Sequence, residues 1–568
     1  MKRTGRLTLF ALVAFTAVFP LLPFVGSYAV DVGFYVGLYV LLGLSLHVVL
    51  GEVGLLDLGH VAFYAIGAYT TAILNTRFQV PTLVLLPLSA LAAALFAVIV
   101  SAPIIHLRGD YFCIVTIGIG EIVRMVLVND PLGWTGGANG INGIANPTIG
   151  VRIQSPLQFY AVVWLVVLAV FNGLRLLQRS RVGRAWNAIR EDEVAARAIG
   201  IDVRGYKLLA FVLGAALAGV AGNLYADKTM SVAPENFSFL ESSLLFCIVL
   251  LGGVGSLPGV LLGAAVVVIF PEVFRGVATY RLLFFGLALM LTMAFRPGGL
   301  WPRRRQQFSA GDAGVEPEAA PPTAAPGDGG PLLEVRGAKL HFGGVVAVNG
   351  LDLVIPAGRI TSLIGPNGAG KTAAFNLITG FYTPDAGQVL FRGQDITRRK
   401  PHLIARLGIA RTFQHVRLFQ GMSCLENVLA GAHAHALPPR RAVEAAAVPM
   451  KQLGLWHDRA ELARNLPYGR QRYLEIARAL AMRPTLLILD EPCAGLNDKE
   501  SAELMEVLRR ISAEGITLLL VEHDMNVVMG VSDHVIVMNQ GSKIAEGTPR
   551  QIYDDPKVIE AYLGKGDV

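Results

Sequence analysis

The chain has 568 residues, of which 53% are hydrophobic and 16% are charged. Soluble domains average about 25% charged residues, so this composition argues against a wholly soluble protein, and the length indicates more than one domain. The net charge is +7, and the cationic residues cluster beside apolar spans, which favours a membrane surface and not nucleic acid. The averages hide two unlike parts, because residues 1–300 are apolar and poor in charge whereas residues 330–568 have an ordinary globular composition.

The first apolar stretch, residues 7–28, follows the cations Lys2, Arg3 and Arg6. A cleaved signal peptide would have a shorter apolar region of about 7–15 residues, and this stretch is longer and contains two prolines. We therefore expect a first transmembrane helix.

Further apolar runs follow, each near the ~20 residues that a bilayer requires, which gives about ten transmembrane helices in all. They cover residues 32–50, 58–76, 81–106, 111–128, 158–178, 207–226, 241–256, 258–276 and 279–295. The 179–207 loop is rich in arginine, whereas Arg152 is the only cation of the 129–157 loop. The positive-inside rule then predicts a cytoplasmic N-terminus and returns the chain to the cytoplasm near Arg303.

Several ionisable residues interrupt the apolar part: Glu52, Asp57, His60, Glu121 and Arg124. Such groups are costly in a membrane, so they line a pathway or pair with one another, and the sequence leaves both interpretations open. Glu121 and Arg124 have the i, i+3 spacing of a pair on one helix face.

The loop after the sixth span contains residues 185–198, which we expect to form one short amphipathic helix. Residues 302–330 are rich in Pro, Ala and Gly without apolar periodicity, so they are expected to be a flexible linker. These features predict a membrane domain over residues 1–301, the linker, and a second domain over residues 331–568. The four cysteines (Cys113, Cys247, Cys424 and Cys493) lack metal or disulfide spacing, and we expect free thiols.

The second domain is organised around a glycine loop. Strands are expected at residues 333–340, 351–355 and 360–364, and the last of these leads into a G-x-x-x-x-G-K-[ST] pattern that a helix follows. This context predicts a phosphate-binding loop in an α/β domain, with backbone N–H groups, a lysine and a Mg²⁺-binding hydroxyl facing an ATP. Its residues are Gly365, Pro366, Asn367, Gly368, Ala369, Gly370, Lys371 and Thr372.

Two later strands end in polar residues. The apolar run 486–489 ends at Asp490 and Glu491, which suit a Mg²⁺ ligand and a base for the hydrolytic water, respectively. Another apolar run, 518–521, ends at Glu522 and His523, and the resemblance to ABC ATPases described next implies that His523 contacts the γ-phosphate.

These segments resemble the motifs of ABC ATPases, in the same order along the chain. The resemblance implies that Phe342 stacks on adenine, and that Gln414 of the Arg411-Thr412-Phe413-Gln414 segment reaches Mg²⁺ and the attacking water. In the loop of residues 179–207, Glu193, Ala195, Ala196 and Gly200 resemble the E-A-A…G loop of ABC importer permeases, which docks on the ATPase. The alternative for that loop is a solvated amphipathic segment.

The position of the ABC signature motif is occupied by Leu466, Pro467, Tyr468, Gly469 and Arg470, where the common pattern is L-S-G-G-Q. In ABC dimers this motif contacts the ATP held by the partner domain. Proline offers neither a hydroxyl nor an N–H, so we expect a weakened contact and an altered ATP site at that position.

The whole chain outside the linker resembles the importers of branched-chain and other hydrophobic amino acids, with permease and ATPase fused. The resemblance rests on residues 51–69, 109–124, 135–141, 296–300, 342–349, 410–414, 494–497 and 561–564, and on the tyrosine of the signature. It implies ATP-driven uptake across the cytoplasmic membrane, with a second permease and a second ATPase, or a second copy of this chain, and an external substrate-binding protein. Urea or short amides are alternative substrates, and an ABC exporter half or a sensor that moves no substrate are alternative functions.

Overall fold

The computed structural model describes residues 16, 18–22, 26–107, 109–149, 151–273, 280–296, 298–302, 330–435 and 439–563. The chain divides into two compact units. The helical unit comprises Met1–Arg190 and Arg204–Arg305, and the α/β unit comprises Glu191–Val203 and Gln306–Val568. The expected linker, residues 302–330, lies almost wholly outside the described residues.

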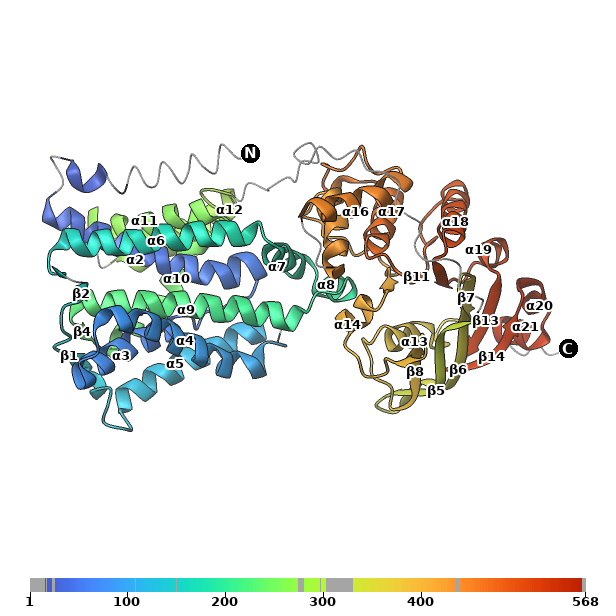
Figure 1. Cartoon of the computed structure of the whole chain (residues 1–568), viewed down its shortest axis with the longest axis horizontal. Coiled ribbons are helices and arrows are strands. Elements are labelled where there is room, and N and C mark those ends of the chain that lie inside the picture. Colours follow the sequence, from blue (N-terminus) through green and yellow to red (C-terminus); the bar gives the residue numbers. More distant parts are fainter. Residues whose placement is uncertain are drawn as a thin grey trace. The chain divides into compact units, whose positions relative to one another are not determined.

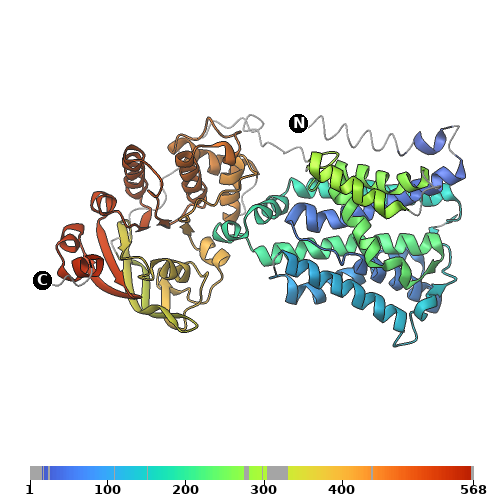
Figure 2. The same ribbon diagram turned by 180° about the vertical axis from the view of Figure 1, so that it is seen from behind.

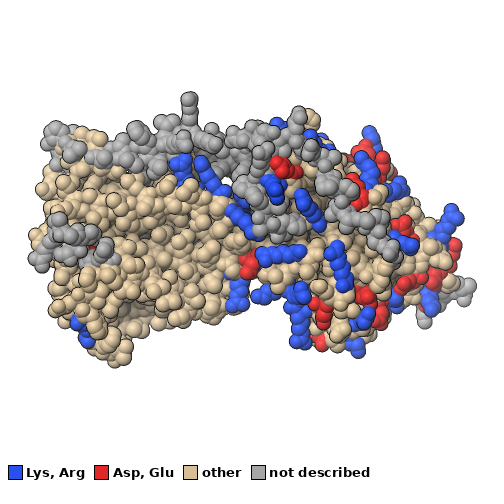
Figure 3. Space-filling model, viewed as in Figure 1, with Lys and Arg blue, Asp and Glu red and all other residues tan. Residues whose placement is uncertain are grey.

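The helical unit is built from long apolar helices that run side by side in both views (Figures 1 and 2). Charged side chains are rare on the face of this unit that Figure 3 shows, and they are frequent on the α/β unit. The helices are α2 (Ser27–Leu46), the π-helix η2 (His47–Val53), α3 (Val61–Phe78), α4 (Thr82–Ile104), α5 (Asp110–Asn129), α6 (Pro156–Gln178), α7 (Arg181–Glu191), α9 (Val203–Thr229), α10 (Phe239–Gly252), α11 (Leu257–Val273) and α12 (Arg281–Phe295).

Five segments among the described residues are long and apolar enough to cross a membrane: Ser27–Val53, Val84–Ile104, Asp110–Asn129, Pro156–Gln178 and Val203–Thr229. Shorter apolar helices, α10 and α11, lie at two further expected positions. An N-terminal domain with several apolar helices is therefore confirmed, whereas the number of ten is not. The expected first span, residues 7–28, falls mostly outside the described residues.

The ionisable residues of the helical unit form buried pairs. His60 Nδ1 lies 2.9 Å from Asp57 Oδ2, and its Nε2 lies 2.8 Å from Ser45 Oγ. Glu52 Oε1 accepts from Gln178 Nε2 at 2.6 Å and lies 3.1 Å from His47 Nε2. These contacts favour the structural interpretation of Glu52, Asp57 and His60, because each buried charge has a partner.

Glu121 and Arg124 also pair as their spacing predicts, with 2.8 Å between Oε2 and Nε.

The π-helix η2 explains the pairing of His47 with Glu52, because residues five apart face each other in a π turn. Gly51 lies directly under the His47 ring, and a Cβ added there would stand 2.5 Å from His47 Nδ1. The carbonyl of Gly51 accepts a hydrogen bond from Arg190 Nη1 at 2.5 Å, within the same unit.

The α/β unit contains two sheets. The larger has the strand order β10-β11-β12-β7-β13-β14, with all neighbours parallel except β13 and β14, and the smaller has the order β6-β5-β8-β9. The strands are β5 (Pro331–Phe342), β6 (Val345–Pro356), β7 (Ile360–Ile364), β8 (Ala386–Phe391), β9 (Gln394–Asp395), β10 (Ile409–Arg411), β11 (Leu486–Asp490), β12 (Thr517–Val521), β13 (His534–Asn539) and β14 (Ser542–Gly547). Every residue of β7, β11 and β12 is buried, as expected for central parallel strands.

Helices cover the sheets (Figure 1). They are α13 (Lys371–Ile378), α14 (Pro401–Arg406), α15 (Cys424–Gly431), α16 (Pro439–Gln452), α17 (Tyr468–Leu480), α18 (Asp498–Ala513), α19 (Met525–Val531), α20 (Pro549–Tyr553) and α21 (Pro556–Leu563). The short helix α8 (Glu193–Ala198) belongs to this unit and packs against α14.

The single helix expected over residues 185–198 is wrong, because the structure forms two helices, α7 and α8. The break lies at Asp192, whose backbone is extended. Its Oδ1 accepts hydrogen bonds from the N–H groups of Val194 and Ala195, at 2.8 and 2.9 Å. An aspartate in this position starts a new helix by satisfying its free N–H groups.

The four cysteines are free, as expected. Burial raises the pKa of the Cys424 and Cys493 thiols to about 12. At pH 8 only about one thiol in 10⁴ would then be ionised, and the thiolate is the reactive form. We therefore expect iodoacetamide to leave both cysteines unmodified in the folded protein and to modify them in guanidinium, as read by peptide mass spectrometry. Modification of either peptide in the folded protein would contradict this burial.

Candidate functional site

The chemistry-bearing segments of the α/β unit all follow neighbouring parallel strands. The glycine loop follows β7, Gln414 follows β10, Glu491 follows β11 and His523 follows β12. Since β10, β11, β12 and β7 are adjacent in that order, their carboxyl ends bring these segments to one edge of the sheet. Ligands of open α/β sheets bind at this edge.

The glycine loop has a backbone that glycine favours. Gly365, Gly368 and Gly370 have φ values of 151°, 83° and 96°. A Cβ at Gly365 would stand 2.1 Å from the carbonyl oxygen of Met538, and one at Gly370 would stand 2.3 Å from that of Ala347. The loop therefore fits tightly between neighbouring strands and presents its backbone to a ligand.

Lys371 begins helix α13 directly after the loop, and Thr372 is the next residue. Lys371 Nζ donates to the carbonyls of Gly365 and Pro366 at 2.6 and 3.0 Å. Burial lowers the pKa of Lys371, while Glu491 and Asp490 oppose this shift. Ala369 is buried, whereas Asn367 and Thr372 are exposed. A cation, a helix N-terminus and free backbone N–H groups form a setting for phosphate.

The acidic pair after β11 occupies two different environments. Asp490 is buried, and its Oδ2 lies 3.5 Å from Arg411 Nη2. Burial raises the pKa of Asp490, and Arg411 counteracts part of this effect. Glu491 adopts a left-handed backbone with φ of 44°, a strained conformation that is concentrated at functional sites.

Glu491 is the meeting point of the expected hydrolytic residues. Its Oε2 accepts a hydrogen bond from Gln414 Nε2 at 3.0 Å and lies 3.7 Å from His523 Nδ1. The structure thus brings Gln414, Glu491 and His523 together from three strands.

Phe342 ends strand β5 and is 47% exposed. It forms an edge-to-face pair with Tyr382 at 5.1 Å between ring centroids. The two rings provide an exposed aromatic surface, as stacking on a base would require.

Comparisons with known proteins address both units. Residues 28–293 match the permease component of branched-chain amino acid transport systems, residues 348–494 match the ABC transporter family, and residues 542–568 match the branched-chain amino acid ATP-binding cassette transporter family. The branched-chain amino acid transport ATP-binding protein BraF of Pseudomonas aeruginosa is 45% identical over 41% of this chain and 98% of its own length. The chain belongs to the branched-chain amino acid ABC transporters.

Two further known proteins are each similar to one part of the chain. The high-affinity branched-chain amino acid permease LivM of Escherichia coli is 39% identical over 56% of the chain and 79% of its own length. The crystal structure of a nucleotide-free ATP-binding cassette from an ABC transporter covers 42% of the chain and all of its own, with 33% identity and a TM-score of 0.39. The family matches and the two curated relatives show that the helical unit contains the permease domain of a multi-pass membrane protein, and that the α/β unit contains an ABC domain that hydrolyses ATP.

The signature segment of this ABC domain lies at the start of α17. Pro467 precedes the helix and provides no side-chain cap, while the N–H of Gly469 lies in the first turn. Arg470 is turned toward its own domain, where it pairs with Asp458 at 2.5 Å and donates to the carbonyl of Gly454 at 2.8 Å. Leu466 is buried and Tyr468 is 43% exposed.

Roles for two arginines beside this site, Arg411 and Arg472, were not predicted from the sequence. Arg411 lies beside Asp490. Arg472 donates hydrogen bonds to the backbone carbonyls of Phe413, Gln414 and Glu491. A signal was present, because Arg472, Glu475 and Arg478 recur every three residues and therefore share one face of a predicted helix, where charges of opposite sign can pair.

The docking segment, Glu191–Val203, is held by two acids. Glu191 Oε2 accepts from the backbone N–H of Gly421 at 2.8 Å, and Asp192 Oδ2 lies 2.9 Å from Arg417 Nη1. This close approach requires a glycine at position 421, because a Cβ added there would stand 2.1 Å from Glu191 Oε1. These contacts lie within the α/β unit.

Proposed function

We propose that this protein drives the uptake of branched-chain or other hydrophobic amino acids across the cytoplasmic membrane, as the fused permease and ATPase of a binding-protein-dependent ABC importer. The observation that carries the proposal is the presence in one chain of a permease and an ATPase that match components of the same transport system. The expected boundaries, a permease domain over residues 1–301 and an ABC domain over residues 331–568, are part of this proposal.

In this proposal ATP binds with its phosphates on the glycine loop, residues 365–372, and with adenine against Phe342. Lys371 supplies positive charge and the α13 N-terminus supplies N–H groups. Mg²⁺, when bound, neutralises charge that develops on the phosphates. Thr372, Asp490 and Gln414 would hold it, a small ligand set that suits an ion bound mainly by water and phosphates.

Glu491 acts as the base for the hydrolytic water. Gln414 donates to the same carboxylate oxygen that His523 approaches, so both side chains fix the orientation of Glu491. His523 is then placed to contact the γ-phosphate. Such a positioned carboxylate contributes about 10²–10⁴-fold to a hydrolysis rate.

The signature segment, residues 466–470, is proposed to complete the ATP site of a partner ATPase. The donors that it presents to a phosphate are the Gly469 N–H and the N-terminus of α17, because Pro467 lacks a hydroxyl and Arg470 is paired with Asp458. Where the partner is a different ATPase, we infer that its site turns over more slowly than the site formed by Lys371 and Glu491.

The assembly proposed here contains a second permease and a second ATPase, or a second copy of this chain, with an external binding protein that delivers the amino acid. The N-terminus and the ATPase lie in the cytoplasm, and the permease domain spans the cytoplasmic membrane several times. ATP-driven closure of the two ATPases acts on the permease through the docking segment and opens the transport pathway outward.

Leucine uptake tests the function. In the native host, deletion of this gene in a strain without other leucine systems should abolish uptake of radiolabelled leucine. The wild-type gene should restore it, and Glu491→Gln should not. Competition with unlabelled valine, phenylalanine and urea then ranks the substrates.

Unchanged leucine uptake after deletion would overturn the substrate assignment and direct attention to urea and short amides. Accumulation of no substrate at all would favour a sensor, and leucine efflux that depends on the gene would favour an exporter.

A further inference from the structure

Helix α17 carries a cluster of three charged side chains that are buried in the α/β unit. Arg472, Glu475 and Arg478 are 1%, 0% and 2% exposed at their side chains. Glu475 lies 3.3 Å from Arg472 Nη1 and 3.7 Å from Arg478 Nη2. Buried charges of this kind seldom increase stability over an apolar core, so their presence suggests that they position neighbouring residues.

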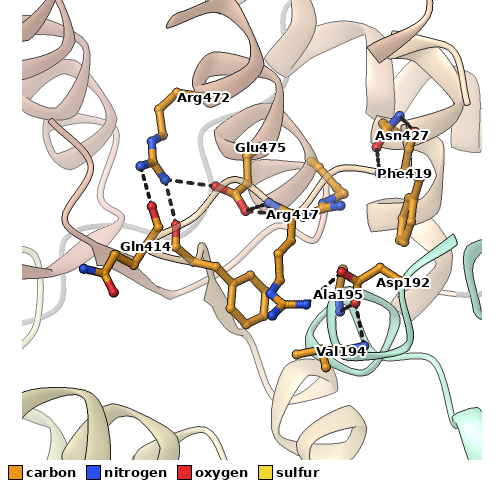
Figure 4. Close-up of polar contacts among 11 residues, drawn as sticks. Asp192, Val194, Ala195, Gln414, Arg417, Phe419, Asn427, Arg472 and Glu475 are labelled. Carbon is orange, nitrogen blue, oxygen red and sulfur yellow. Dashed lines mark hydrogen bonds and ion pairs between the residues drawn. The ribbon is translucent and has the colours of Figure 1, made fainter. Parts of the chain in front are cut away.

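Arg472 connects the helix to the hydrolytic residues. It donates to the carbonyls of Phe413 at 2.7 Å, Gln414 at 2.9 Å and Glu491 at 3.3 Å (Figure 4 shows the contact with Gln414). Gln414 and Glu491 are the two residues whose side chains bond to each other. One guanidinium therefore fixes the backbone of both partners of that hydrogen bond.

Glu475 connects the same cluster to the docking segment. Its Oε1 accepts from the backbone N–H of Arg417 at 3.1 Å. The Arg417 side chain then reaches Asp192, the residue that caps α8 (Figure 4). An unbroken path of charge-assisted contacts thus runs from Glu491 through Arg472, Glu475 and Arg417 to Asp192.

We propose that Arg472 and Glu475 are positioning residues that make ATP hydrolysis at Glu491 depend on the seating of the docking segment. Loss of the Asp192 contact lets Arg417 move, Glu475 follows, and Arg472 no longer aligns the carbonyls of Gln414 and Glu491. The signature segment begins the same helix, so the state of the docking segment also reaches the segment that faces the partner's ATP. The inference rests on the proposed roles of Gln414 and Glu491.

A double-mutant cycle tests this path in the complete assembly, purified through a tag on this chain from the native membranes. Asp192→Asn keeps the oxygen that caps α8 but removes the charge that meets Arg417. Glu475→Gln keeps an acceptor for the Arg417 N–H but removes the charge that meets Arg472. Each variant should lower kcat for ATP about fivefold, the size expected for loss of one ion pair, and leave KM for ATP unchanged.

The decisive measurement is the kcat of the double variant. On a single path the double variant Asp192→Asn/Glu475→Gln should be no slower than Glu475→Gln alone. Independent effects that multiply would overturn the proposal, because separate sites act additively in free energy. A rise in KM with unchanged kcat would also overturn it. The control is Glu334→Gln, which breaks the exposed pair with Arg336 on β5 and should leave both constants unchanged.

A second pair keeps the test decisive if Glu475→Gln fails to assemble. Arg417→Glu sets a like charge beside Asp192 and should slow hydrolysis more than Asp192→Asn does. Adding Asp192→Asn to Arg417→Glu removes that repulsion and should restore at least about twofold, whereas no recovery would overturn the path. ATP hydrolysis needs no identified substrate, so an assembly that shows this pattern without importing leucine would refute the substrate assignment alone.

Discussion

Replacement of Glu491 by Gln should reduce ATP hydrolysis by about 10²–10³-fold, because the amide keeps the size of the side chain but cannot accept the proton of the attacking water. The effect should fall on kcat. The glycine loop and Lys371 are untouched by this change, so ATP binding should persist. Phosphate release by the purified assembly measures the rate, and equilibrium filtration of labelled ATP measures the bound nucleotide.

Two observations make Glu491 the side chain to test. It is the point at which Gln414 and His523 converge, and its own backbone is held at a φ of 44° that glutamate rarely adopts. Glu560→Gln, an exposed carboxylate on α21, is the matched control and should change nothing. A Glu491→Gln rate within about fivefold of wild type would show that another group activates the water.

Gly59→Ala should have the largest effect on the permease domain. A Cβ at Gly59 would stand 1.8 Å from the carbonyl oxygen of Thr116 and 2.5 Å from its carbonyl carbon, and these are backbone atoms of α5 that no rotamer can move. Forcing atoms into such a contact typically costs about 1–3 kcal/mol, and more where backbone opposes backbone. Folded protein in the membrane should fall severalfold, as measured by fluorescence-detected size exclusion in detergent.

The damage should spread beyond the contact itself. Gly59 N–H donates to Asp57 Oδ1, and the neighbouring Leu58 N–H donates to Thr116 Oγ1, so separating α5 from this loop disturbs the Asp57–His60 pair as well. Gly118, on α5, provides the control, because a Cβ there meets nothing within 4 Å. Gly118→Ala should express like wild type, and equal behaviour of the two variants would refute the close approach.

The ATPase domain could be predicted from short sequence motifs. The strand before Gly365 and the acids after residues 486–489 are recognisable because each motif lies within a few consecutive residues. The roles of Arg472 and Glu475 could not be read in the same way. Arg472 is 58 residues from Gln414 and 19 from Glu491, and Glu475 is 58 residues from Arg417, so only the folded chain brings these partners together.

The permease domain illustrates a different limit. Hydrophobicity located its apolar helices, but it could not distinguish a pathway residue from a structural pair. Glu52 meets His47 through a five-residue spacing that only a π turn provides, and the i, i+3 and i, i+4 rules do not anticipate it. Asp192 was overlooked as a helix start because the amphipathic pattern continues across it.

The π-helix of residues 47–53 also has a mechanical meaning. A wide turn contains one residue more than the α turn that it replaces, and that surplus can travel along a helix without breaking it. Each step by which the surplus migrates turns the intervening residue by about 100° around the helix axis. Migration of this turn would therefore rotate part of the segment Ser27–Val53 about its own axis. The carbonyl of Gly51 links the wide turn to Arg190, the residue that immediately precedes the docking segment in the chain.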